Sequence, residues 1–406
     1  MRESLDELAE LAQTAGGEVI GEGTQKVESA NPATYIGKGK AEEFAKYCKE
    51  HTVDTVIFDD ELTPAQTRNL EKIFEVKILD RTALILDIFS QRARTREGKL
   101  QIELAQLQHL LPRLTRFWGH LSRQSGGIGM RGGEGESQLE ADRRKVNERI
   151  DSITRDLDAV RQQRETQRAG RKRNEWPLAS IVGYTNAGKS TLLNRLTGAS
   201  VLAKDILFAT LDPTTRQIEL PGGQLALLTD TVGFIQKLPT QLVAAFRATL
   251  EEIREADLLL HVLDITHKNA SQQTDTVLET LKELRADERP IITVLNKIDL
   301  MEGVDEREVG KLAGDLGLPD DYVAVSAERG WGLDTLRQRI EDTLGQRFVP
   351  LAVLIPYKRN DLVALWHQRG VVESEEYVGE GTRIVGRVPG ALAAQLAQFL
   401  LGDEGA

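Results

Sequence analysis

Eight consecutive residues organise this chain: Gly183-Tyr184-Thr185-Asn186-Ala187-Gly188-Lys189-Ser190. They follow the spacing G-x-x-x-x-G-K-[ST], in which glycines let successive backbone N–H groups point at phosphate oxygens. Lys189 is placed to reach the β- and γ-phosphates of a nucleotide, and the Ser190 hydroxyl to bind Mg²⁺. The apolar run 178–182 predicts a strand before this loop, and 191–196 predicts a helix whose N-terminus favours an anion. A glycine-rich turn without a ligand would also fit this motif, so further loops are needed to decide.

A second loop, Asp230-Thr231-Val232-Gly233, follows the apolar run 225–228. In this D-x-x-G pattern the carboxylate can hold Mg²⁺ through water, and the glycine N–H can sense a γ-phosphate. A third loop, Asn296-Lys297-Ile298-Asp299, follows the run 291–295, and a fourth, Ser326-Ala327, follows 322–325. All four loops occur in order, each after a predicted strand, so we expect them to converge on one ligand.

The third and fourth loops indicate which base is bound. In the pattern N-K-x-D, the Asp299 carboxylate can accept two hydrogen bonds, from the ring N–H and the exocyclic amine of guanine. Adenine cannot supply that pair, and a buried carboxylate left unpaired is costly, so the discrimination is steep. A backbone N–H at Ser326-Ala327 can meet the guanine O6. The sequence therefore predicts a domain that binds GTP and GDP and hydrolyses GTP.

The segment before the second loop is expected to change with the nucleotide. It reads Phe208-Ala209-Thr210-Leu211-Asp212-Pro213-Thr214-Thr215. A threonine hydroxyl here completes the Mg²⁺ shell when GTP is present, with Thr210 as first choice and Thr214 as second. The predicted metal ligands are therefore Ser190 and Thr210. The predicted nucleotide contacts comprise the four loops, residues 208–212 and Thr191.

The catalytic group is not identified by these motifs. Phe234 follows Gly233, at the position where Ras-type enzymes carry the glutamine that orients the attacking water. An apolar side chain cannot orient water, so intrinsic hydrolysis should be slow and depend on another group or a partner. We hypothesise that Phe234 swings away when that partner binds. Unchanged partner-stimulated turnover in Phe234→Ala would contradict this gating role.

Composition limits the class of protein. The chain has 406 residues and a net charge of −11, so the whole molecule is not a general binder of polyanions. The only cysteine, Cys48, excludes a disulfide framework, and the six histidines show no metal-binding spacing. We find no signal peptide, lipidation motif or apolar run long enough to span a membrane. A cytoplasmic protein, monomeric when free, is expected.

Residues 1–98 alternate strand and helix patterns. The runs 53–58 and 76–79 predict buried strands, and 41–50 and 64–74 predict helices. This alternation favours a small α/β domain with parallel strands. The stretch Gly37-Lys38-Gly39-Lys40 lacks the full phosphate-loop spacing and is better explained as a turn before a helix.

Residues 99–174 predict a basic helical hairpin. Apolar residues recur at helical spacing in two segments: Leu100, Leu104, Leu107 and Leu111, then Leu139, Val146, Ile150, Ile153, Leu157 and Val160. A loop between them contains glycines from Gly126 to Gly135, with Phe117, Trp118 and His120 near its start. Residues 92–131 hold eight Lys/Arg against two Asp/Glu, and 143–173 hold eleven against five. This charge favours binding to RNA, with rings stacking on unpaired bases, but a solvated coiled coil with a mobile loop fits equally well. Arg171-Lys172-Arg173 is expected to be a polar linker.

The remaining residues complete the predicted architecture. Residues 175–347 form the P-loop GTPase domain, and 348–406 form a small α+β domain. In the latter, strands are expected at 351–355, 371–377 and 383–388, and helices at 361–368 and 391–401. The predicted fold class is therefore α/β, a P-loop GTPase domain preceded by a small α/β domain with a helical coiled-coil hairpin and followed by the small α+β domain.

Over nearly its full length the chain resembles the HflX family of translational GTPases. Outside the GTPase loops, the resemblance is carried by Tyr35-Ile36-Gly37-Lys38-Gly39-Lys40, Glu61-Leu62-Thr63-Pro64-Ala65-Gln66, Asp80-Arg81-Thr82, Arg94-Thr95-Arg96-Glu97-Gly98-Lys99 and Leu121-Ser122-Arg123-Gln124-Ser125-Gly126-Gly127-Ile128-Gly129. Within the GTPase region it includes the phosphate loop, residues 208–214 and Asp230-Thr231-Val232-Gly233-Phe234-Ile235.

The resemblance implies a function. HflX-like proteins bind the large ribosomal subunit, and well-studied members split stalled ribosomes under stress. Their N-terminal domain and glycine-rich tip reach toward the peptidyl-transferase region of ribosomal RNA. It also implies Mg²⁺ at Ser190 and Thr210, guanine at Asn296 and Asp299, and an apolar residue where Phe234 stands.

The tip departs from the family pattern. The family reads G-T-R-G-P-G-E-T-Q, whereas this chain reads Gly129-Met130-Arg131-Gly132-Gly133-Glu134-Gly135-Glu136-Ser137-Gln138. The lost proline and added acidic residue predict a more flexible tip and leave the strength of the RNA contact open. The alternative function is a regulatory GTPase that acts on a protein effector without the ribosome.

Overall fold

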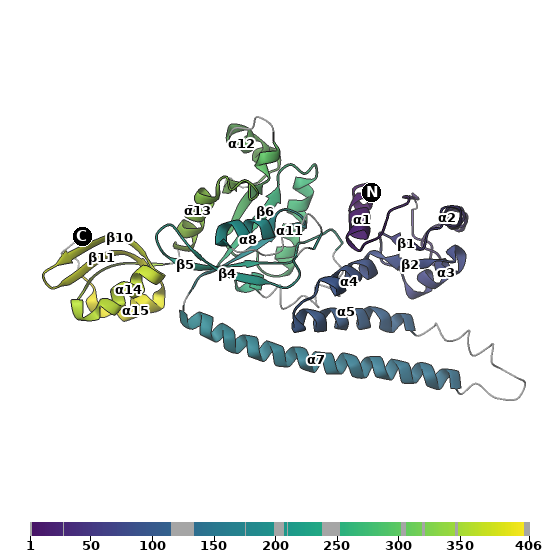
Figure 1. The fold of residues 1–406 in the computed structure, drawn as a ribbon, viewed down its shortest axis with the longest axis horizontal. Coiled ribbons are helices and arrows are strands. Elements are labelled where there is room, and N and C mark those ends of the chain that lie inside the picture. Colours follow the sequence, from purple (N-terminus) through teal and green to yellow (C-terminus); the bar gives the residue numbers. More distant parts are fainter. Residues whose placement is uncertain are drawn as a thin grey trace, which may run out of the picture. The chain divides into compact units, whose positions relative to one another are not determined.

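The computed structural model describes residues 2–26, 28–114, 134–174, 176–198, 207–208, 210–237, 252–301, 306–318, 321–345 and 348–401. As far as the structure describes it, the chain divides into two compact units (Figure 1). Unit 1 contains Met1–Gln162, Ile206–Leu211 and Gln236–Arg247. Unit 2 contains Gln163–Asp205, Asp212–Ile235 and Ala248–Ala406. The chain therefore passes between the units several times, including on either side of the D-x-x-G loop.

Unit 1 is built on a pair of parallel strands, β1 (Thr55–Phe58) and β2 (Lys77–Asp80), as the alternation predicts. The predicted helices are present as α2 (Lys38–Glu50) and α3 (Pro64–Phe74). Two further helices were not predicted, α1 (Arg2–Thr14) and α4 (Arg81–Arg92). The run of apolar residues in α4 is nearly continuous because most of this helix is buried, so it lacks the one-sided pattern that marks a surface helix.

Local sequence explains where α3 starts. The Thr63 side chain accepts a hydrogen bond from the Gln66 N–H, and the Gln66 side chain accepts one from the Thr63 backbone N–H. This capping box satisfies backbone groups that a helix start leaves unpaired, and Pro64 suits the first helical position. The stretch Gly37-Lys38-Gly39-Lys40 was expected to be a turn before a helix, but only Gly37 precedes α2, as its N-cap, and residues 38–40 already belong to the helix.

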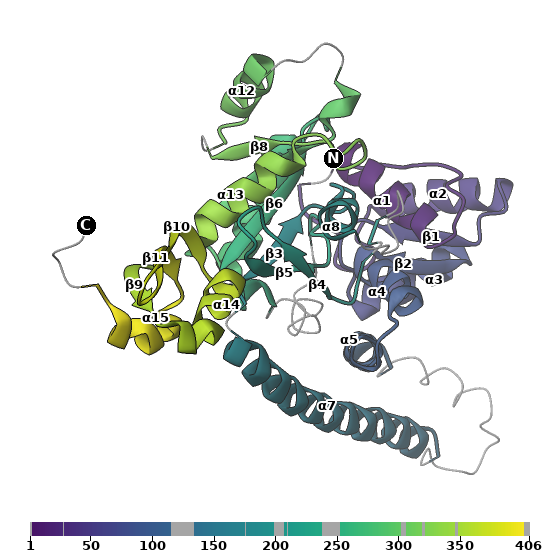
Figure 2. The ribbon, with the colours of Figure 1, turned by 60° about the vertical axis from the view of Figure 1, so that its left-hand side comes forward.

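A helical hairpin completes unit 1, although the end of its second helix, from Gln163 on, belongs to unit 2. Helix α5 (Arg96–Leu114) lies beside the long helix α7 (Glu134–Asn174) (Figures 1 and 2). The buried contact is the predicted apolar stripe, since Leu100, Ile153 and Leu157 pack with Leu104 and Leu107.

Helix α7 extends into both the expected tip and the expected linker of the hairpin. Residues 115–133, including Phe117, Trp118, His120 and most of the glycines, lie outside the described residues. Two expectations were wrong. Residues 134–138, predicted as part of a loop, belong to α7, and so do Arg171-Lys172-Arg173, predicted as a linker. The helix continues because residues 139–174 contain many good helix formers, and Gly135 near its start interrupts it only weakly.

Unit 2 contains a mixed sheet. Within the described residues it has six strands in the order β4-β5-β3-β6-β7-β8. These are β3 (Leu178–Gly183), β4 (Thr214–Glu219), β5 (Leu225–Asp230), β6 (Leu258–Asp264), β7 (Ile291–Asn296) and β8 (Tyr322–Ala324). Only the pairing of β4 with β5 is antiparallel among them. Because the other strands are parallel, the loops after β3, β5, β6, β7 and β8 leave the same edge.

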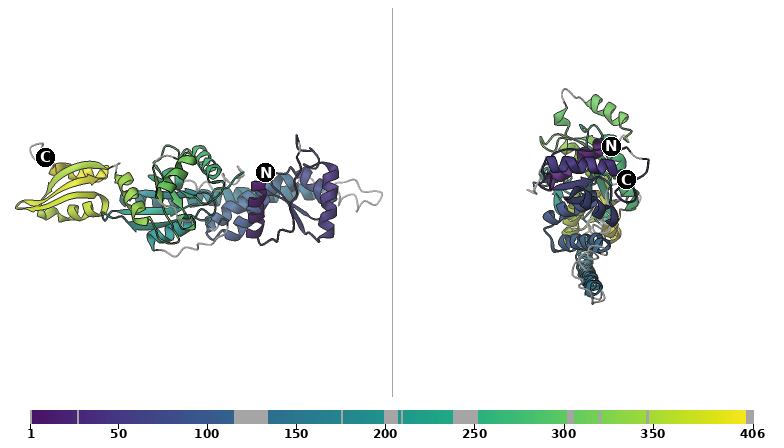
Figure 3. Two further views of the ribbon diagram at one scale, coloured as in Figure 1. Left: turned by 90° about the horizontal axis from the view of Figure 1, so that it is seen from above. Right: turned by 90° about the vertical axis from the view of Figure 1, so that its right-hand side faces the viewer.

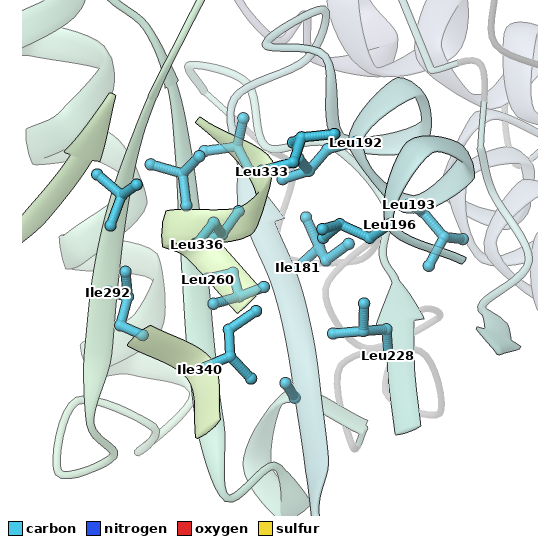
Figure 4. Packing of buried hydrophobic residues seen from close by; sticks show 14 of the residues in the cluster. Ile181, Leu192, Leu193, Leu196, Leu228, Leu260, Ile292, Leu333, Leu336 and Ile340 are labelled. Carbon is cyan, nitrogen blue, oxygen red and sulfur yellow. The ribbon is translucent and has the colours of Figure 1, made fainter. Parts of the chain in front are cut away.

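Helices cover this sheet. They are α8 (Lys189–Thr197), α11 (Ala270–Glu283), α12 (Glu306–Asp315) and α13 (Leu333–Gly345), with a 3-10 turn, η1, at Ile298–Leu300. On one face, leucines of α8 and α13 meet aliphatic side chains of the central strands (Figure 4). The labelled residues include Leu192, Leu196, Leu336, Ile181 and Leu260. This apolar packing holds α8, and with it the loop at its N-terminus, against the sheet.

The C-terminal part of unit 2 is a small α+β module. Its strands β9 (Val349–Ile355), β10 (Val371–Val378) and β11 (Gly381–Val388) are antiparallel in the order β10-β11-β9. Helices α14 (Asn360–Arg369) and α15 (Gly390–Leu396) pack with this sheet in the module, which is the yellow part of the ribbon in Figure 3. Trp366 of α14 is fully buried in their common apolar core. Short 3-10 turns lie at Tyr357–Arg359 and Ala397–Phe399. The element order agrees with the prediction, but the expected helix 391–401 was too long, because its α-helical part ends at Leu396.

Candidate functional site

The phosphate loop joins β3 to α8, and two of its glycines are required by close contacts. A Cβ on Gly183 would lie 2.3 Å from the Val262 carbonyl oxygen of β6, and Gly183 has φ 151°. A Cβ on Gly188 would lie 2.2 Å from Asn296 Nδ2, and Gly188 has φ 96°. Any other residue would therefore push the loop away from the strands that support it.

Lys189 is buried at the centre of the site. Its Nζ donates a hydrogen bond of 2.6 Å to the Tyr184 carbonyl, across the curve of the loop. Burial lowers the pKa of Lys189 to about 8, and the nearby Asp230 carboxylate opposes that shift. A Cβ on Gly233 would lie 2.8 Å from Thr185 Cα and 2.9 Å from Lys189 Nζ, so the glycine of D-x-x-G is needed because the backbone of the phosphate loop passes so close. Lys189 Nζ and Gly233, whose N–H is expected to sense the γ-phosphate, are thus next to each other.

The donors expected for Mg²⁺ also lie together. Ser190 Oγ donates a 2.6 Å hydrogen bond to Asp230 Oδ2. A hydroxyl and a carboxylate are oxygen ligands of the kind Mg²⁺ prefers, with the remaining positions left to water and phosphate. Thr185 Oγ1 is buried and has no hydrogen-bond partner among the described residues, as expected of a group that faces a polar ligand. The residues present therefore fit a magnesium nucleotide.

The D-x-x-G loop is tied to the phosphate loop through backbone bonds. The Phe234 N–H donates to the Gly183 carbonyl at 3.1 Å, and the Thr185 N–H donates to the Phe234 carbonyl at 2.8 Å. Thr231 Oγ1 donates to the Ile181 carbonyl at 2.7 Å. The Phe234 side chain is only 2% exposed. A movement of this ring would therefore expose apolar surface that is now buried.

Asn296 joins three of the predicted loops. Its Nδ2 donates to the Ala187 carbonyl of the phosphate loop at 2.8 Å, and its Oδ1 accepts from the Ala327 N–H at 3.0 Å. Asp299 follows in η1 and is partly exposed. Lys297 has φ 67° and forms an ion pair of 2.7 Å with Asp264 at the end of β6. Asn296 thus holds the N-K-x-D and Ser326-Ala327 loops against the phosphate loop, and Lys297 ties the N-K-x-D loop to β6.

Two contributors were missed from the sequence. Arg195 of α8 donates through Nε to the Ala327 carbonyl at 3.1 Å and through Nη2 to the Glu328 carbonyl at 2.5 Å. His261 lies inside β6 and is 1% exposed, and burial together with the charge of Lys189 lowers its pKa to about 4. The apolar run around His261 was the available signal, because it marks another buried strand between the second and third loops.

The segment 208–215 is placed differently from the other loops. Phe208, Thr210 and Leu211 belong to unit 1, where the Phe208 ring packs against Phe89 of α4 with centroids 4.6 Å apart. Ala209 lies outside the described residues, and Asp212 belongs to unit 2. Thr214, the second choice for Mg²⁺, starts β4 and pairs in register with Asp230. The metal role of Thr210 therefore stays a prediction.

The described residues contain neither a cluster of metal-binding side chains nor a helix that could span a membrane. No group of three or more His, Cys, Asp or Glu side chains there could hold a metal ion. No described helix is long and apolar enough to cross a membrane.

Family models match most of the chain. The GTP-binding GTPase N-terminal model matches residues 2–90, the GTP-binding GTPase middle-region model matches 92–171, and the 50S ribosome-binding GTPase model matches 179–297.

Curated relatives cover nearly all of it. The GTPase HflX of Caldanaerobacter subterraneus is 48% identical over 399 residues, which is 98% of this chain and 90% of the relative. The GTPase HflX of Escherichia coli K12 is 45% identical over 380 residues, 94% of this chain and 88% of the relative. A solved GTP-binding protein from Sulfolobus solfataricus in complex with GDP is 28% identical, with a TM-score of 0.45, covering 85% of this chain and 96% of that one. The sequence relatives and family models show that the chain is a P-loop GTPase that hydrolyses GTP and belongs to the HflX family.

Proposed function

We propose that this GTPase, loaded with GTP and Mg²⁺, binds the large ribosomal subunit through its basic helical hairpin and splits or rescues stalled ribosomes under stress. The observation that carries the proposal is the charge of the hairpin. The apolar stripes of α5 and α7 face each other, which leaves Arg143, Arg144 and Lys145 exposed on α7. Consecutive exposed cations on a rigid helix suit the phosphate backbone of RNA.

The nucleotide site supplies the switch in this proposal. Lys189 contacts the phosphates, Ser190 and Thr210 bind Mg²⁺, and Asn296 and Asp299 select guanine. Mg²⁺ neutralises charge on the β- and γ-phosphates, and the chain's own residues hold the nucleotide and sense its γ-phosphate. GTP would order the segment around Thr210 for docking, and hydrolysis would release the protein.

The proposal assigns a separate role to each of three parts of the chain and adds a fourth part, the C-terminal module. Residues 1–98 and 99–174 reach the RNA, 175–347 bind the nucleotide, and 348–406 form the C-terminal module. The matched family description names a 50S ribosome-binding GTPase, which supports the choice of the large subunit. The alternative, a regulatory GTPase acting on a protein effector, predicts no association with ribosomal subunits.

Salt-dependent co-sedimentation tests the proposal. In the presence of a non-hydrolysable GTP analogue, the affinity for large subunits should fall steeply with salt, because each phosphate contact releases counterions. Replacing Arg143, Arg144 and Lys145 with Gln should lower the slope of log affinity against log salt by about 2 to 3. The matched control replaces Lys358, Arg359 and Arg387, exposed on the C-terminal module, to which the proposal assigns no RNA contact, with Gln and should keep the slope.

Two results would contradict the proposal. A flat salt response of the parent would exclude binding through the RNA backbone, and absence of co-sedimentation would favour the protein-effector alternative.

Splitting itself is measured by light scattering of intact ribosomes, which should fall on addition of the protein with GTP.

A further inference from the structure

Two short segments next to the nucleotide loops fold with unit 1. Ile206–Leu211 contains Thr210 and ends just before the start of β4. Gln236–Arg247 begins three residues after Gly233 of the D-x-x-G loop. Both segments that are expected to respond to the γ-phosphate, the one with Thr210 and the one with Gly233, therefore lie at or next to a point where the chain passes between the two units.

Lys237 attaches the second of these segments to two carboxylates. Its Nζ lies 2.6 Å from Asp59 Oδ2 and 2.6 Å from Asp60 Oδ1. Burial alone would lower the pKa of Lys237, but hydrogen bonds to the two carboxylates raise it overall. Asp59 and Asp60 directly follow β1, so they project from the end of a strand and not from a flexible loop tip. In the chain, Lys237 is separated from Asp59 by 178 positions and from Asp60 by 177 positions.

The carboxylate pair is itself held in place by the rest of unit 1. Asp59 also accepts hydrogen bonds from Ser4 Oγ at 2.5 Å and from Arg81 Nη1 at 2.7 Å. Arg81 is 2% exposed and also pairs with Glu7 of α1. Asp60 accepts a hydrogen bond from the Tyr35 hydroxyl. An isolated surface ion pair contributes little, but this one ends a network that includes α1, β1 and α4.

The backbone at the attached residues is strained. Lys237 has φ 53° and Phe208 has φ 54°, and this left-handed backbone conformation is rare for residues other than glycine. Both residues make their side-chain contacts with unit 1, Lys237 with Asp59 and Asp60, and Phe208 with Phe89. The Phe208 ring is 1% exposed. Strain of this kind persists only where surrounding contacts over-determine it, and it is a feature of switch regions.

From this arrangement we infer that Lys237 and Phe208 are positioning residues for GTP turnover. Through its contacts within unit 1, Lys237 restrains the segment that follows Gly233, and Phe208 restrains the segment that contains Thr210. The Asp59–Asp60 pair then sets how readily those segments rearrange around the nucleotide. Because coupling between sites is reciprocal, any ligand that disturbs the pair changes nucleotide exchange, and the bound nucleotide changes the affinity for that ligand. When the contacts break, the strained residues relax and the segments move more freely, so exchange becomes faster.

A double-mutant cycle tests the inference. Lys237→Gln and Asp60→Asn should each raise the dissociation rate of fluorescent GDP by about five-fold or more, and the double variant no further than the larger single effect. Lys237→Arg keeps the charge and should restore the parent rate. The matched control, Lys38→Gln, removes an exposed lysine of the same unit that pairs with Glu42, and it should leave the rate unchanged.

Three results would overturn the inference. They are a parent-like rate in Lys237→Gln, effects of Lys237→Gln and Asp60→Asn that multiply independently, and an equal effect of Lys38→Gln. If Lys237→Gln does not fold, as judged by circular dichroism, the GDP dissociation rate of Asp60→Asn is compared with that of Lys237→Arg instead. No ribosome is present in this assay, so its failure is separate from a failure of the proposed ribosomal role.

Discussion

Asn296 is a predicted base contact whose side chain also holds two other loops in place. Its amide bonds to the phosphate loop and to the Ser326-Ala327 loop at the same time. The asparagine of N-K-x-D therefore fixes the distance between the loops that are predicted to bind phosphate and base. Asp299 follows three residues later in η1, where its side chain is partly exposed and can reach a base.

Asp299 is the residue on which base selectivity should depend. In Asp299→Asn, an amide replaces one of the two acceptors that guanine needs and offers a donor that suits xanthine. Affinity for GTP should fall by about a hundredfold, and affinity for xanthosine triphosphate should rise. Equilibrium binding of GTP, xanthosine triphosphate and ATP measures the change. Asp334→Asn, at an almost fully exposed position of α13, is the control, and retained GTP preference in Asp299→Asn would refute the assignment.

At the scale of the element, the helical hairpin depends on a narrow apolar contact. Ile153 is fully buried and Leu157 nearly so, while the rest of this part of α7 is largely polar and exposed. Arg149, one turn before Ile153, forms a two-pronged pair with Glu103 of α5, with distances of 2.7 and 2.8 Å. The stripe and the ion pair both join the helices, but only the stripe is removed from water.

Ile153→Ala should therefore destabilise the hairpin far more than Arg149→Ala. Loss of the buried side chain leaves a cavity and should cost about 2 to 4 kcal/mol. The Arg149–Glu103 pair is exposed to solvent, so its loss should have little effect. Native-state hydrogen exchange of α7 reports the opening free energy of the hairpin in each variant. Equal losses in the two variants would show that the ion pair, and not the stripe, holds the helices together.

At the scale of the whole molecule, the central strand β6 should make folding sensitive to mild acid. His261 has a pKa of about 4 in the folded protein, because it is buried and lies near Lys189, compared with 6.5 ordinarily. Between these values the unfolded chain binds a proton that the folded chain does not. Stability is therefore complete above pH 6.5 and falls as the pH drops toward 4, by about 2 kcal/mol at pH 5.

Urea unfolding at pH 7.5 and pH 5, followed by tryptophan fluorescence, measures this loss. Three of the four tryptophans, Trp176, Trp331 and Trp366, belong to unit 2, where His261 lies. His261→Gln should flatten the dependence between the two pH values. The carboxyl groups of Asp59 and Asp80 have pKa values below the ordinary 3.8, so their contributions are lost only at lower pH. An unchanged dependence in His261→Gln would show that another group is responsible.

The sequence by itself determined the GTPase domain, because its loops are short, chemically specific and placed after strands that apolar runs announce. The loops after β3, β5, β7 and β8 were predicted from residues next to one another in the chain, as were α3 and the apolar stripe of the hairpin. The four-part division of the chain, the nucleotide contacts of the four loops and the metal roles of Ser190 and Thr210 remain predictions.

Only the tertiary structure decided the contacts that cross the chain. The bonds of Asn296 to Ala187 and Ala327, the burial of His261 near Lys189, and the attachment of Lys237 to Asp59 and Asp60 join residues far apart in sequence. Such contacts have no periodic pattern, since each partner alone is an ordinary polar residue. Helix α4 escaped prediction for a related reason: a helix buried on most sides loses the alternation of polar and apolar residues by which a helix is recognised.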